Sequence, residues 1–189
     1  MKKILCLTAA IVLLLSCVAC SADVKDTLEG TPQELLAQLK ETAAADFGVG
    51  FDSAVTAETA QGTLGLTADE FEKHVDSAYE SAAAISAVAQ SNVLVKCKDA
   101  AAAANVKKLT AKGYDSGKWI CVYPEQSVVV ESGSYVLLAV GTKESTDALV
   151  AALKALSKDN MGTPDVFSIY EPDPEAGDII GGGEDPILF

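Results

Sequence analysis

The chain has 189 residues, of which 49% are hydrophobic and 22% are charged, and this length and composition fit one globular domain. Its 14 basic residues are all lysines, they face 27 acidic residues, and the net charge is -13. A chain without arginine and with this excess of acids is unsuited to neutralising a phosphate backbone, so we exclude nucleic acid as a partner.

Residues 1–19 predict a lipoprotein signal peptide. Two lysines precede an apolar run from residue 4 to residue 15, which is typical of a secretory signal and too short to span a bilayer as a lasting helix. The segment Val18-Ala19-Cys20 then resembles a lipobox, in which the cysteine sulfur carries a diacylglyceryl group. We predict lipidation at Cys20, with Cys17 as the alternative, and therefore an extracytoplasmic protein anchored to the cell membrane.

The N-terminal part of the mature chain predicts a tether followed by two short helices. Residues 20–30 are polar and unpatterned, as expected of a lipidated tether. Thr31 and Glu34 form a capping-box pattern around a proline suited to the first helical position, and Thr67 and Glu70 repeat that pattern ahead of a second helix. Residues 42–66 have no sustained apolar period, and we predict that they are irregular.

Two similar units at a spacing of about 41 residues predict the sheet. In the first unit, a strand from residue 86, a turn at Ser91-Asn92 and a strand over residues 93–97 precede a helix over residues 99–112. In the second unit, strands on both sides of Gly133-Ser134 precede a helix over residues 145–156. We therefore predict an α+β fold: an antiparallel sheet built from two strand-strand-helix units, with the helices on one face and N-terminal helices before it.

The last part of the chain differs in composition from the rest. Residues 159–189 contain eight acids, four prolines and a run of three glycines, but no lysine. We predict a domain over residues 31–157 and an acidic tail over residues 158–189, although residues 165–170 could add an edge strand.

The lipobox, the helix start at Gly65-Leu66-Thr67 and the segment from Glu125 through Gly133 and Tyr135 to Leu138 carry a family resemblance. In these features, the chain resembles the domain of unknown function 4358 (DUF4358) family, found in lipoproteins of low-GC Gram-positive bacteria. The resemblance covers roughly residues 31–156. It implies a compact α+β domain on the cell surface and no assigned activity.

His74, the only histidine, is the first candidate for chemistry. Glu70 precedes it by four residues on a predicted helix, but a zinc site needs three or four ligands, and no second histidine or cysteine pair joins them. As a general base, His74 would need a serine or cysteine nucleophile that only the fold could bring close. We predict a solvated helix face, no metal site, no cofactor and no catalytic residue.

Cys97 and Cys121 are the cysteines of the predicted domain. A disulfide between them would close a loop of about 24 residues, worth on the order of 3 kcal/mol in the chain-entropy model. The alternation of Val93, Val95 and Cys97 along one strand face favours buried free thiols instead.

Two further groups invite a binding interpretation. Acidic residues alternate at Glu171, Asp173, Glu175 and Asp178, in the manner of a calcium loop. Prolines intervene, however, alanine stands where the loop needs glycine, and glycine stands where it needs the bidentate glutamate. The aromatic residues Tyr114, Trp119, Tyr123 and Tyr135 would form a ligand platform if they were exposed together on one sheet face. We expect Trp119 to belong to the core.

The function that this composition favours is a surface-anchored binding or envelope-associated module without catalysis. One alternative is an extracytoplasmic hydrolase of envelope or peptide material built around His74. Another is an accessory lipoprotein of a transporter. The sequence does not name a protein or small-molecule partner.

Overall fold

A computed structural model of the chain describes residues 26–84, 88–119 and 122–169. The predictions for the signal peptide, Cys17, Cys20, Cys121 and the alternating acids Glu171, Asp173, Glu175 and Asp178 lie outside these residues.

In the described residues, six strands form one sheet in the order β1-β2-β3-β5-β4-β6, and every neighbouring pair is antiparallel. The strands are β1 (Gly50–Ala54), β2 (Val75–Ala83), β3 (Ser91–Cys97), β4 (Gln126–Ser132), β5 (Tyr135–Gly141) and β6 (Asp165–Ile169). The helices are α2 (Pro32–Ala43), α3 (Ala60–Leu64), α4 (Ala68–His74), α5 (Ala100–Gly113) and α6 (Lys143–Leu156), with a 3-10 turn η1 (Ser116–Lys118). The predicted α+β class and antiparallel sheet are confirmed.

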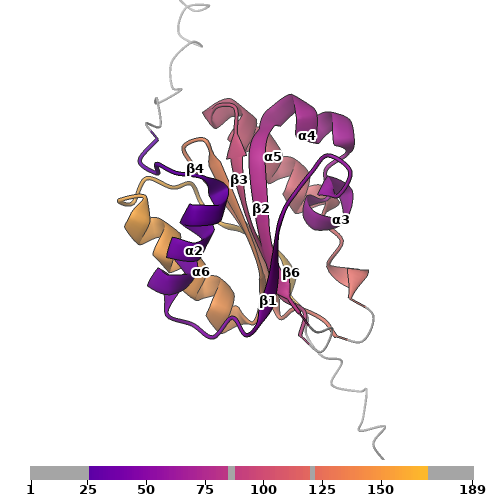
Figure 1. The fold of residues 1–189 in the computed structure, drawn as a ribbon, viewed down its shortest axis with the longest axis vertical. Helices are drawn as coiled ribbons and strands as arrows, with labels where there is room; N and C mark the ends of the chain where they lie inside the picture. The colour runs from indigo at the N-terminus through magenta and orange to yellow at the C-terminus, as the bar shows by residue number, and fades with distance from the viewer. Residues whose placement is uncertain (1–25, 85–87, 120–121, 170–189) are drawn as a thin grey trace, which may run out of the picture.

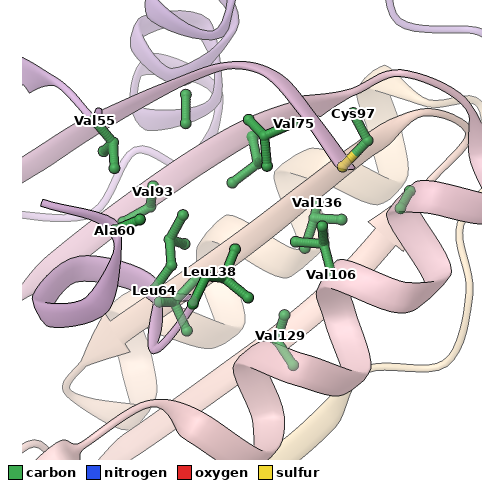
Figure 2. Close-up of a cluster of buried hydrophobic side chains, with 14 of the residues drawn as sticks. Val55, Ala60, Leu64, Val75, Val93, Cys97, Val106, Val129, Val136 and Leu138 are labelled. Atoms are coloured by element: carbon green, nitrogen blue, oxygen red, sulfur yellow. The ribbon is translucent and has the colours of Figure 1, made fainter. Parts of the chain in front are cut away.

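Helices cover both faces of the sheet (Figure 1), so the prediction of helices on one face was wrong. On one face, α2 and α6 pack on a first apolar cluster, which includes Leu94, Leu137 and Ala139. On the other face, the helices α3 and α5 pack on a second apolar cluster, which includes Val93, Val129 and Leu138 (Figure 2). Helix α4 adds the partly buried Phe71 to this cluster. The two faces alternate along β5, where Val136 and Leu138 belong to the second cluster and their neighbour Leu137 to the first.

Side-chain caps fix the helix starts that the sequence predicts. Thr31 accepts from the backbone N–H of Glu34, whose carboxylate accepts from Thr31 in return, and Thr67 and Glu70 form the same capping box. The turn at Gly133 is also confirmed: Gly133 has φ +58°, and a Cβ there would lie 2.0 Å from an Asp26 carboxylate oxygen. Only glycine fits both the backbone conformation and the space.

The first predicted unit needs a correction. Its first strand is β2, earlier in the chain than residue 86, and Ser91-Asn92 lies inside β3 instead of forming the turn. The helix predicted after the capping box at Thr67 and Glu70 ends at His74, because Val75 already pairs with Cys97 in the sheet. Pairing with β1 on one side and β3 on the other stabilises β2, although its residues are mostly poor strand formers.

Three more boundaries differ from the prediction. The stretch predicted to be irregular contains β1 and α3. From residue 26 onward, the predicted tether packs on the domain, where Leu28 is buried. Part of the predicted tail also belongs to the domain, since β6 pairs with β4 as the predicted edge strand. The domain therefore extends at least from Asp26 to Ile169.

Candidate functional site

Residues 26–30, next to the predicted lipid anchor, are hydrogen-bonded to the β4–β5 hairpin, and we call these contacts the clamp. The two carboxylate oxygens of Asp26 accept from the backbone N–H and from the hydroxyl of Ser134, each at 2.6 Å. The Tyr135 hydroxyl donates to the Gly30 carbonyl at 2.8 Å, and the Thr27 hydroxyl donates to the Ser157 carbonyl at 2.8 Å. The clamp fixes the chain six residues after Cys20 to one end of the sheet. Among the described residues, no helix is long and apolar enough to span a bilayer.

His74 is the last residue of α4 and is partly buried. It lines an open groove between α4 and α5 with Asp69, Glu70, Lys73, Asn105, Lys108 and Leu109. Neither serine nor cysteine, the nucleophiles that the hydrolase hypothesis invokes, is among these lining residues.

Glu70 is already committed to its capping box. Hydrogen bonds from the backbone N–H and the hydroxyl of Thr67 lower the pKa of the Glu70 carboxyl, and the charge of His74 lowers it slightly further. Within the described residues, no three histidine, cysteine, aspartate or glutamate side chains form a group that could hold a metal ion.

Cys97 is a free thiol buried among the aliphatic side chains of the second cluster (Figure 2). Burial, and to a smaller extent the charge of Asp99, raise the pKa of this thiol to about 12. A thiol that stays protonated at neutral pH is a poor nucleophile. The structure therefore gives Cys97 a packing role.

The aromatic residues do not form one platform. Tyr114 and Tyr135 are buried on opposite faces of the sheet, and Tyr123 is exposed. Trp119 is partly buried, and the ammonium of Lys118 lies 5.3 Å from its ring centre and 4.8 Å from that of Tyr114. Because the chain's own lysine lies over these two rings, they do not present a free surface to a ligand.

The edge strand β1 is the most exposed element of the sheet, and the sequence did not predict it. All five of its residues are exposed, and its apolar side chain Phe51 is 71% exposed, next to Val49 at 83%. Hydrogen bonds join the Val49 carbonyl to Ala84 and the Val55 N–H to Ala78. In an antiparallel pair, successive residues direct their N–H and C=O groups alternately toward the neighbouring strand and away from it. The N–H and C=O groups of Gly50, Asp52 and Ala54 therefore point away from β2.

A groove of about 270 Å³ borders this edge on the face covered by α2. It is lined by Gln33, Leu36, Ala37 and Lys40 of α2 and by Asp52, Tyr79 and Ser81 of β1 and β2. The Lys40 ammonium donates to the Ser81 hydroxyl at 2.7 Å and lies 5.7 Å from the Phe47 ring centre. None of the ion pairs among the described residues includes Asp52, which leaves its exposed carboxylate available.

No family model, curated protein or solved structure matches the chain, and the resemblance to the DUF4358 family stays a prediction.

Proposed function

We propose that this chain is a surface-anchored lipoprotein with a non-catalytic binding domain, and that β1 binds an extended segment of another protein. The observation that carries the proposal is that all five residues of β1 are exposed, together with the apolar side chains of Val49 and Phe51. In β-strand addition, main-chain hydrogen bonds supply affinity, and pockets for alternate side chains supply specificity.

Natural proteins usually block such an edge. Charged side chains (lysine above all), proline, bulges, a very short strand or a covering segment prevent a free edge strand from pairing with other chains. Strand β1 contains neither lysine nor proline, its register with β2 is regular from Gly50 to Ala54, and its one charged residue is Asp52. An open edge with an exposed phenylalanine is therefore a feature with a cost, and a binding role explains why it is present.

The clamp relates the position of β1 to the predicted lipid anchor. If a lipid at Cys20 anchors the chain, the clamp at Asp26 holds the β4–β5 hairpin end of the sheet close to the bilayer, because six residues span at most about 20 Å. Strand β1 begins at the opposite end: Gly50 pairs with Ala83, whereas Val75, at the start of β2, pairs with Cys97 near the hairpin. Val49 and Phe51 would then lie at the end of the sheet that is far from the bilayer.

A second copy of the chain fits this edge less well. Two identical edge strands related by a two-fold axis normal to the sheet pair antiparallel, which directs their clamped ends in opposite directions. That arrangement works against anchoring both copies in one bilayer. The net charge of -13 also makes two copies repel each other.

The test is a selection from a displayed library of extended peptides against the mature chain in detergent. Ala54→Pro removes an N–H that points away from β2, so it blocks strand addition and leaves the ladder to β2 intact. Ala54→Val is the matched control, since it keeps the N–H. We expect the selected peptides to bind the wild type and Ala54→Val, and to bind Ala54→Pro at least tenfold more weakly.

Phe51→Lys is a second edge variant, which changes only an exposed side chain and does not threaten folding. It should also weaken peptide binding. Three results would overturn the proposal. The first is no enrichment of peptides, and the second is that the edge variants bind the selected peptides as tightly as the wild type does. The third is a dimer of the wild type in light scattering that Ala54→Pro dissociates. The anchor is tested separately, because Cys20→Ala should release the protein to the medium or leave it uncleaved.

A further inference from the structure

We infer that the segment added to β1 carries a lysine or arginine, flanked by apolar residues, and that this basic side chain is selected by Asp52 at the groove under α2. The inference rests on the proposed function of β1 and names the chemistry of its partner.

The register of the sheet decides which side chains of the partner meet which surface. Asp52 pairs with Ser81, whose side chain lines the groove under α2, so Asp52 lies on that face and Phe51 on the other. A residue of the added strand directly opposite Asp52 projects over the groove. Its two neighbours project to the other face, on the side of Phe51.

The charges at the groove favour a cation at the position opposite Asp52. The groove's own ammonium, that of Lys40, donates to Ser81 on β2, which lies one strand further from the partner than Asp52. The Asp52 carboxylate is exposed and forms no ion pair with the described residues. The first charged group that an added strand meets is therefore negative.

The whole chain reinforces this preference. Its net charge of -13 attracts cationic segments and repels acidic ones before contact. On the opposite face, an apolar neighbour in the partner covers the Phe51 ring, which is otherwise 71% exposed to water. The pattern that fits both faces is an apolar, basic, apolar triplet in an extended conformation.

The experiment selects peptides from the same displayed library against the wild type, Asp52→Lys and Glu58→Lys. Glu58 is exposed in the loop after β1 and does not line the groove, so Glu58→Lys makes the same change in net charge elsewhere. We expect the wild type and Glu58→Lys to select lysine or arginine between apolar residues. Asp52→Lys should select glutamate or aspartate at the same position.

A second measurement gives the size of the effect. Fluorescence anisotropy with one selected peptide and its lysine-to-glutamine variant should show about a two- to fivefold loss of affinity for the wild type at low salt. The loss should shrink in 1 M salt, where the screening length falls to about 3 Å.

The outcomes separate this inference from the proposed function. Peptides that bind through β1 but show the same residue preference for the wild type and Asp52→Lys would overturn the basic partner and leave strand addition intact. Selection of acidic peptides by the wild type would do the same. Peptides whose binding does not depend on the edge variants would overturn both.

Discussion

Lys107 is a nearly buried cation that joins three elements, and Lys107→Met tests what it contributes. Its ammonium lies 2.8 Å from a Glu131 carboxylate oxygen on β4 and 3.5 Å from an Asp165 carboxylate oxygen on β6. It also donates to the Thr163 carbonyl. Methionine keeps most of the aliphatic packing and removes the charge together with these contacts.

The burial of the partners sets the magnitude. Removing one member of a fully buried ion pair costs roughly 3–5 kcal/mol, because the other charge stays unpaired. Here the side chain of Lys107 is 10% exposed and that of Glu131 is 27% exposed, but the Glu131 oxygen that faces Lys107 is itself buried, so water can solvate only the rest of the freed carboxylate. We therefore expect Lys107→Met to lower the free energy of unfolding by about 2 kcal/mol.

Urea denaturation measures this value, and a double-mutant cycle with Glu131→Gln isolates the pair. The double variant should be less destabilised than the sum of the two single variants, by about 1 kcal/mol. Lys108→Met is the matched control, since Lys108 is the exposed neighbour on the same helix. A loss below about 0.5 kcal/mol for Lys107→Met, or additive effects in the cycle, would refute the reasoning.

Three further predictions follow from individual contacts. In a Cys121→Ser background, Cys97 should not react with a thiol reagent in the native protein at neutral pH, and rapid native labelling would contradict its burial. Because burial raises the pKa of this thiol from 9.0 to about 12, its contribution to the free energy of unfolding should fall as the pH rises between these two values. Asp26→Ala should accelerate amide hydrogen exchange at Ser134, because it removes the acceptor of that N–H, and an unchanged rate would contradict the clamp. His74→Ala should change the free energy of unfolding by less than about 0.5 kcal/mol in urea denaturation, and a loss above about 1 kcal/mol would reveal a structural role.

The sequence predicts those elements whose signals are local. The capping boxes at Thr31 and Thr67 and the turn at Gly133 depend on neighbouring residues alone, and the structure contains all three. Strand β2 depends on its neighbours in the sheet instead. Its serines, alanines and acids give no strand signal, and only pairing with β1 and β3 determines its conformation.

The sequence contains a signal for helices on both faces of the sheet, and the prediction of helices on one face did not use it. The seven residues of β5 are all buried, and a strand covered on both faces has such a continuous apolar run, whereas a strand covered on one face alternates. The candidate site had no comparable signal. Strand β1 is exposed throughout and lies in a glycine-rich stretch, so it has no apolar periodicity.

Amide hydrogen exchange along β1 tests the central claim most directly, because it reports on the hydrogen bonds that strand addition would form. In the free chain, the amides of Gly50, Asp52 and Ala54 should exchange faster than those of Phe51 and Ser53, which face β2. A selected peptide should slow the exchange of Gly50, Asp52 and Ala54 and leave the other two nearly unchanged. A peptide that binds without slowing these three amides would contradict the assignment of β1 as the binding surface.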